Sequence, residues 1–153
     1  MKKVIFVSAA LLSAAWAMAQ AQTAAPAPLT DVVASRQASM ALLYGTWQGM
    51  RAGVAAKVEP RRFVVSAKGI APLARQIPAL FPPGSGIGRL GFAAIYDERA
   101  DFEKMAAAMA TAGEAVLKAA QANDEEAFAT AVKGLSDSCG GCHTKRFGGN
   151  WAQ

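Results

Sequence analysis

The amino-acid sequence predicts an all-α protein, folded as an antiparallel four-helix bundle with a long connection between the second and third helices. Its apolar residues recur at three- and four-residue steps, which is the period of an amphipathic helix. The apolar runs are rich in alanine, and Val, Ile and Thr do not alternate with polar residues as they do in strands. A length of 153 residues, with 53% hydrophobic and 18% charged residues, is typical of one packed domain.

The N-terminus has the pattern of a secretory signal peptide. Two lysines precede an apolar run over residues 4–16, and a small-residue cleavage site follows at residues 17–19. The run is shorter than the about 20 residues that a membrane-spanning helix needs. We therefore expect removal of residues 1–19, with cleavage after Ala19 or Ala21, and a mature protein outside the cytoplasm that does not enter the membrane.

The first helix follows a Gln-, Ala- and Pro-rich segment, residues 20–29, that we expect to be a disordered leader to the domain at residues 30–153. Thr30 and Asp31 are typical of a helix start, and Pro60 stops the helix after about Lys57. The face that we expect to be buried carries Val33, Arg36, Met40, Leu43, Trp47, Met50 and Val54.

The second helix is expected to begin at Pro60, which suits the first turn of a helix. Gly69 and Pro72 interrupt it, and a kink is expected there because proline removes a backbone hydrogen bond and crowds the preceding turn. Prolines and glycines from Pro78 to Gly91 then predict a connection of about twenty residues, which is long for a compact domain. The inward face carries Phe63, Ala67, Ile70, Leu73 and Ile77.

The third helix is expected to begin within residues 97–101 and to end before Asn123, and the fourth helix to begin at residues 124–125. The inward residues expected on the third helix are Phe102, Met105, Met109, Val116 and Leu117. Those expected on the fourth are Phe128, Ala131, Val132, Leu135, Cys139, Cys142 and His143.

The strongest functional signal is the CxxCH motif at the end of the fourth helix. Cys139 and Cys142 are the only cysteines of the chain, and His143 is its only histidine. This motif is the attachment signature of c-type haem. Thiols about one helical turn apart can add to the two vinyl groups on one edge of a porphyrin. His143 would then bind the iron from the proximal side. The sequence predicts one covalently attached haem c.

Three other interpretations of the motif compete with haem attachment. A redox dithiol normally lies near the start of a βαβ unit, whereas this motif lies near the C-terminus of a helical chain. Structural zinc usually needs four Cys or His ligands, and this chain has three such residues. A disulfide between Cys139 and Cys142 would suit an oxidising compartment. Haem attachment remains the preferred interpretation.

Several stretches of the chain resemble the cytochrome c′ family. They are Arg-Gln-Ala-Ser-Met at residues 36–40, Leu-Phe-Pro-Pro-Gly-Ser at 80–85, Ala-Ile-Tyr-Asp at 94–97 and the near-C-terminal CxxCH. The resemblance covers essentially the whole mature chain. It implies a bacterial periplasmic haem protein, often a homodimer formed through its first two helices. In most members the iron is five-coordinate and binds nitric oxide or carbon monoxide, and low-spin relatives take a methionine from the first helix as sixth ligand.

The resemblance also implies roles for two residues of the first helix. Arg36 would lie near a haem propionate, where a guanidinium donates charge-assisted hydrogen bonds to carboxylate. The alternative is a solvated arginine. Met40, one turn later, is the distal residue and is a candidate either to line the haem pocket or to bind the iron. A single histidine excludes a bis-histidine iron within one monomer, but a core methionine is more often a packing residue than a ligand.

The residues after His143 depart from the family pattern, which often places an aromatic and then a basic residue there. In this chain the order is reversed: the cations Lys145 and Arg146 come first and the aromatic Phe147 follows. Phe147 therefore stands where many members have a cation beside the proximal histidine. Lys145 and Arg146 also suit a docking patch for a redox partner. Cations at a helix C-terminus are, however, common without any such role.

Two functions are therefore open from the sequence. One is the binding of nitric oxide or carbon monoxide at an open iron face. The alternative is a low-spin electron-transfer cytochrome, with Met40 as sixth ligand and a periplasmic redox partner. No general base or second polar constellation indicates an enzyme. Despite a pI of about 9.5, no basic cluster interleaved with aromatic residues indicates nucleic-acid binding.

Overall fold

The computed structural model describes residues 29–85 and 92–147, and within these ranges it contains helices and turns but no strand. In chain order the elements are α2 (Leu29–Ala55), η1 (Pro60–Phe63), α3 (Val64–Lys68), α4 (Ile70–Gln76), η2 (Ile77–Leu80), α5 (Phe92–Asp97), α6 (Arg99–Ala122), α7 (Glu125–Gly140) and the π-helical turn η3 (Gly141–Arg146). The predicted four-helix bundle is confirmed. The expected signal peptide and nearly all of the leader lie outside the described residues.

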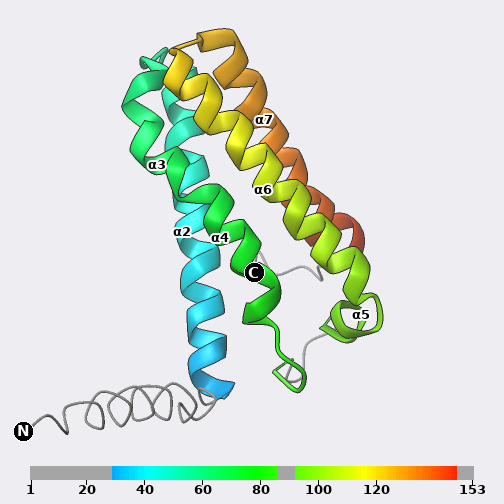
Figure 1. The fold of residues 1–153 in the computed structure, drawn as a ribbon. Coiled ribbons are helices and arrows are strands. Elements are labelled where there is room, and N and C mark those ends of the chain that lie inside the picture. The colour runs from blue at the N-terminus through cyan, green and yellow to red at the C-terminus, as the bar shows by residue number, and fades with distance from the viewer. Residues whose placement is uncertain (1–28, 86–91, 148–153) are drawn as a thin grey trace, which may run out of the picture.

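The helices form two pairs that converge at one end of the bundle. α6 packs mainly against α7 and α4, and α2 packs mainly against α7. Figure 1 shows α2 with α3 and α4 on one side of the bundle and α6 with α7 on the other. The two sides meet where α6 turns into α7 and lie farther apart at the end that carries α5. No helix in the described part of the chain has both the length and the hydropathy of a membrane span.

The first helix ends close to the predicted position, through a residue in the left-handed conformation. Lys57 has a φ of 52°. Its amide donates to the Val54 carbonyl at 3.1 Å, and the amide of Val58 donates to the Gly53 carbonyl at 2.9 Å. This pair of bonds satisfies the last carbonyls of α2 and reverses the chain toward η1.

The turn between α6 and α7 falls where the sequence predicts and also holds the second helix. Asn123 ends α6 in the left-handed conformation, with a φ of 57°. Its side chain accepts a hydrogen bond from the Arg61 amide at 3.0 Å and donates one to the Glu59 carboxylate at 3.2 Å. Asp124 then caps α7 by accepting from the Ala127 amide at 2.9 Å. One short turn therefore connects three of the four helices.

The second helix is broken as expected but is longer than expected. Pro60 lies in the first turn of η1, and α3 gives way to α4 at Gly69. Pro78 does not begin the connection, as the sequence suggested. It lies instead in the first turn of η2, where its missing amide is not needed, and the helix continues to Leu80. The connection to the third helix is therefore shorter than expected, and it leads into α5, which was not predicted.

The buried face of α6 consists largely of small residues, which the prediction missed. Met105, Met109 and Leu117 were expected in the core but are only half-buried. The reason is close helix packing: a Cβ atom on Gly113 would lie 2.7 Å from Cγ2 of Ile70 on α4. Small side chains allow the two backbones to approach this closely. The buried residues of α6 are Phe102, Ala106, Ala110, Gly113, Val116, Ala119 and Ala120.

This packing can be tested by adding one methyl group at each of two glycines. We expect Gly113→Ala to lower the free energy of unfolding by about 1–3 kcal/mol because the core must shift to admit the new atom. Gly134 is exposed on α7 and would place its Cβ atom in open space, with nothing within 4 Å. Gly134→Ala should raise stability by up to about 1 kcal/mol through helix propensity. Urea denaturation followed by circular dichroism measures both, and equal effects would contradict the close contact.

Candidate functional site

The CxxCH motif lies where α7 changes from an α-helix to a π-helical turn. Cys139 belongs to the last turn of α7, and Cys142 and His143 belong to η3. All three residues are half-buried, and Cys142 packs against the hydrophobic core. The Phe147 amide donates to the Cys142 carbonyl at 2.8 Å, a bond that spans five residues and is characteristic of a π-helix. The expected inward direction of the motif is therefore met only in part.

Burial keeps the three side chains of the motif in their neutral forms at neutral pH. Loss of hydration raises the pKa of the Cys139 thiol, and it raises the pKa of Cys142, where the neighbouring Cys139 adds to the effect. Loss of hydration also lowers the pKa of the His143 imidazole. An uncharged imidazole keeps a lone pair on one ring nitrogen, and this is the form that binds a metal.

The described residues bear on each of the three competing interpretations of the motif. Cys139 and Cys142 are free and are not joined by a disulfide. Within residues 29–85 and 92–147, no group of three or more His, Cys, Asp and Glu residues could hold a metal ion. These residues also form no βαβ unit around a dithiol. Two free thiols and a neutral imidazole on one half-buried turn fit the attachment edge and the iron of a haem.

Met105 of α6 lies against the turn that carries the motif. A Cβ atom on Gly141 would lie 3.4 Å from the Met105 Cε atom. Glycine at this position therefore leaves room for the methionine beside the backbone of η3. The sequence placed Met105 only as a core residue. Its position one turn after the buried Phe102 was a signal that it faces the end of α7.

Met40 lies on α2, is half-buried and packs against the hydrophobic core. This matches the expectation that its thioether faces inward rather than toward solvent. α2 also packs against α7, the helix that leads into the motif. Its role as a pocket residue or as an iron ligand stays a prediction.

Arg36 is buried, which excludes the alternative of a solvated arginine. Its side chain donates to the Leu80 carbonyl through Nε and Nη2, at 3.0 and 2.9 Å, and to the Ser85 hydroxyl through Nη2 at 2.8 Å. Its Cζ atom also lies 3.9 Å from the centroid of the Phe81 ring. Loss of hydration lowers the pKa of this guanidinium, which nonetheless stays charged at any physiological pH. Arg36 therefore fixes residues 80–85 to α2, and its contact with a propionate stays a prediction.

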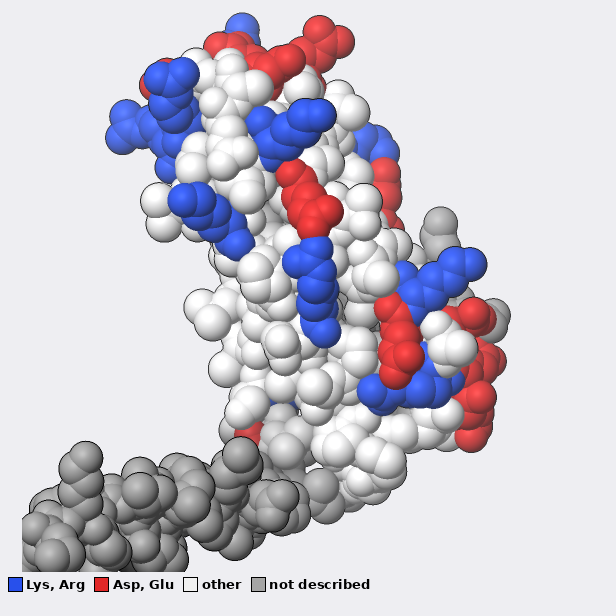
Figure 2. Space-filling view, viewed as in Figure 1, with Lys and Arg blue, Asp and Glu red and all other residues white. Residues whose placement is uncertain are grey.

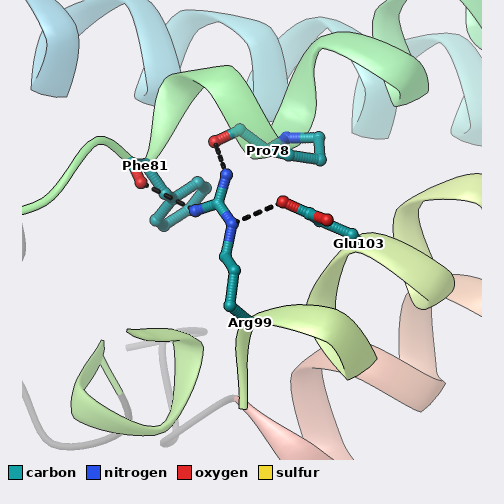
Figure 3. A network of polar contacts seen from close by, with 4 residues as sticks. All are labelled: Pro78, Phe81, Arg99 and Glu103. Carbon is teal, nitrogen blue, oxygen red and sulfur yellow. Dashed lines mark hydrogen bonds and ion pairs between the residues drawn. The ribbon is translucent and has the colours of Figure 1, made fainter. Parts of the chain in front are cut away.

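A second arginine, which the sequence analysis did not single out, binds the same segment from α6. Arg99 donates to the Pro78 carbonyl at 2.8 Å and to the Phe81 carbonyl at 2.9 Å (Figure 3). Its Nε also lies 2.8 Å from the Glu103 carboxylate, one turn along the same helix. Cations at the C-terminal end of a helix are stabilised by the exposed carbonyl groups. Arg36 and Arg99 thus hold the end of η2 between α2 and α6.

Tyr96 completes this polar cluster from α5. Its hydroxyl donates to the Pro82 carbonyl at 3.1 Å and lies 3.1 Å from the Ser85 hydroxyl. The Ser85 hydroxyl in turn donates to the Pro82 carbonyl at 2.7 Å. Of the four stretches that carry the family resemblance, residues 36–40 and residues 94–97 therefore both contact residues 80–85. Their joint presence in the sequence was the signal for this cluster.

Phe147 follows the motif and is buried, with 9% of its surface exposed. Its ring packs edge-on against Phe102, with 5.5 Å between ring centroids. An aromatic residue at this position is thus used for packing within the bundle. The side chains of Lys145 and Arg146 lie outside the described part of the structure, so the docking patch stays a prediction.

The cluster around Arg36 predicts a stability difference between two arginine variants. Arg36→Lys should lower the free energy of unfolding by about 1.5–3 kcal/mol, since an ammonium cannot reach the carbonyl and hydroxyl groups together. Arg75 forms an ion pair with Glu114, and both side chains are 54% exposed. Arg75→Lys should therefore cost less than about 1 kcal/mol. Thermal and urea unfolding of the two variants measure the difference, and a neutral Arg36→Lys would contradict this role.

Comparison with known proteins gives one consistent result. A family model described as Cytochrome C′ matches residues 31–146. A curated relative, cytochrome c-556 of Agrobacterium fabrum, is 40% identical over 70 residues, which is 46% of this chain and 47% of the relative. The match thus spans about half the length of that protein.

Solved structures share the fold at low sequence identity. A ferrous variant of cytochrome c prime from Alcaligenes xylosoxidans with bound NO has a TM-score of 0.70 and 23% identity, over 79% of this chain and 98% of that one. A cytochrome c′ described as having an unusual ligand-controlled dimer dissociation has a TM-score of 0.73 and 21% identity, over 82% of this chain and 100% of that one. At these identities the likeness establishes the four-helix fold.

Proposed function

Because the chain belongs to the cytochrome c′ family and is a haem protein, we propose that it holds one haem covalently through Cys139 and Cys142, with His143 as the proximal iron ligand. The observation that carries the proposal is that Cys139, Cys142 and His143 lie together, half-buried, at the end of α7, with both thiols free. Burial also lowers the pKa of the imidazole, which favours its uncharged form. Bound haem supplies an iron that can take up a diatomic gas or exchange an electron.

The residues of the turn have separate tasks in this proposal. Each cysteine would add its S–H group across one vinyl double bond of the haem, so that sulfur would bond one carbon and hydrogen the other, and no oxidant would be needed. Cys139 and Cys142 would thereby hold one edge of the porphyrin at the end of α7. His143 then offers a neutral ring nitrogen, and the buried Phe147 ring after it keeps this end of the helix in the core.

We favour the binding of nitric oxide or carbon monoxide as the function. A solved relative of the same fold is described with bound NO. The Met105 side chain, which lies against the turn that carries the motif, is apolar, as suits the pocket of a small uncharged gas. Such a role requires that the face of the iron opposite His143 stays open.

The second candidate is an electron carrier in which Met40 closes that face. The specific observation in its favour is that Met40 is half-buried on α2, one turn after the buried Arg36. A thioether sulfur is a suitable iron ligand and raises the reduction potential of a haem. The partner would then be a periplasmic redox protein rather than a gas.

The location and assembly of the protein follow from other parts of the chain. The signal-peptide pattern of residues 1–19 supports a periplasmic location. Large apolar side chains lie exposed on the first two helices, with exposed fractions of 66% for Leu42 and 83% for Val65. Figure 2 shows Lys and Arg side chains at the end where α2 leads into α3, and Lys and Arg alternating with Asp and Glu along α6. Together with the dimer described for one relative, this supports a homodimer through these helices.

Covalent attachment predicts a clear effect of removing the two thiols. The exported protein should keep its haem on a denaturing gel and in acid–acetone extraction, because thioether bonds survive both. The double variant with Cys139→Ser and Cys142→Ser should release its colour in either treatment. Ser138→Ala, beside Cys139, serves as the control and should retain the haem. A wild-type protein that loses its colour on extraction would contradict the proposal.

The spin state of the ferric iron separates the two candidate functions. We expect a high-spin optical and EPR spectrum that changes on addition of nitric oxide and that Met40→Ala leaves high-spin. Met109→Ala, which removes a half-buried methionine from α6, controls for loss of packing. An iron–methionine absorption band that disappears in Met40→Ala alone would establish the electron carrier instead.

A further inference from the structure

Three buried phenylalanines, Phe81, Phe102 and Phe147, form a continuous column between the first and last helices. Phe81 and Phe102 meet edge-to-face, with centroids 5.1 Å apart and planes at 75°. Phe102 and Phe147 meet in the same way, at 5.5 Å and 85°. Aromatic pairs in this geometry add to the stability that burial gives. The three rings come from different segments of the chain, so this aromatic column forms only when the bundle is folded.

Arg36 fixes the outer end of this aromatic column to α2. Its guanidinium carbon lies 3.9 Å from the Phe81 centroid, while its donors bind carbonyl groups on both sides of that residue, at Leu80 and Ser85. Arg99 binds the Phe81 carbonyl from α6. Contacts to both its ring and its backbone therefore fix the position of Phe81, the first residue of the aromatic column.

Phe147, at the other end of the aromatic column, is hydrogen-bonded to the turn that carries the motif. The Phe147 amide closes the π-helical turn on the Cys142 carbonyl, at 2.8 Å. A π-helical turn is rare and is maintained by its surroundings rather than by local preference. Phe147 supplies such support, because its ring packs on Phe102 while its amide closes the turn. His143 lies inside that turn.

We propose that Phe147 is a positioning residue for His143, acting through the aromatic column and through the hydrogen bond that its backbone amide donates to the Cys142 carbonyl. The inference rests on the proposed function, in which His143 binds the haem iron. This role explains why the chain has an aromatic residue where many family members have a cation. At position 147 the aromatic ring can contact Phe102. The orientation of the imidazole toward the iron would then depend on a chain of contacts that leads from Phe147 through Phe102 and Phe81 to Arg36 of α2.

The test is the iron–histidine stretching band in the resonance Raman spectrum of the ferrous holoprotein. Phe147→Leu and Phe102→Leu should each broaden this band and shift it to lower frequency, because the imidazole is held less firmly. Phe147→Tyr keeps the ring and should restore the wild-type band. Hydrogen exchange should show loss of protection of the residue 147 amide in Phe147→Leu.

The matched control is Phe128→Leu. Phe128 is 1% exposed and stacks on Phe63 with centroids 5.5 Å apart, in an aromatic pair formed by η1 and α7 that does not include the column. This variant should lose comparable stability in urea and leave the Raman band unchanged. If Phe147→Leu does not accumulate, Phe102→Leu carries the same expectation.

The outcomes separate the two proposals. The iron–histidine band is observed from five-coordinate ferrous haem, so it is also measured in Met40→Ala, which removes the candidate sixth ligand. Absence of the band from both the wild-type protein and Met40→Ala would overturn the proposed ligand and hence the proposed function. A wild-type band that neither Phe147→Leu nor Phe102→Leu moves, with stability lowered as in Phe128→Leu, would leave the haem ligand in place and overturn the positioning role.

Discussion

The buried guanidinium of Arg36 is the constraint on which the site end of the bundle depends. A charge removed from water is costly unless hydrogen bonds replace its hydration. Here the replacement comes from the carbonyl groups of Leu80 and Ser85, from the Ser85 hydroxyl and from the face of Phe81. These partners must keep their positions for the arginine to stay buried. The segment after η2 is thereby fixed to α2, and Arg99 fixes the same segment to α6.

Two regions of the bundle are stabilised by different means. Where α4 meets α6, small residues allow backbone contact, and Gly113 sits directly against Ile70. At the end with the CxxCH motif, large aromatic rings and arginine–carbonyl bonds hold the helices instead, and the two helix pairs lie farther apart (Figure 1). Close packing by alanine and glycine leaves no room for a cofactor. A covalently attached haem therefore suits the second kind of packing, where longer side chains set the spacing.

The functional choice between gas binding and electron transfer depends on a single position on α2. In the proposed function His143 binds the iron, and with one histidine in the chain no second imidazole is available to the iron within a monomer. Whether that face is open depends on Met40, whose flexible thioether can pack beside a haem or bind it. The proximal side is more constrained, since the turn around His143 is closed by Phe147 and packed through Phe102.

The sequence by itself determined the helices and most of their ends, because periodicity and capping residues are local properties, and the spacing of the CxxCH motif predicted its chemistry. It also indicated that Arg36 and Met40 share the inward face of the first helix. Only the tertiary structure decided which groups these residues meet. The partners of Arg36, the role of Arg99 and the burial of Phe147 against Phe102 join residues far apart in the chain. Likewise, periodicity predicted that the large side chains of α6 are buried. In the structure, contact with α4 buries mainly its alanines and Gly113 instead, because the distance between two helices depends on the side chains of both.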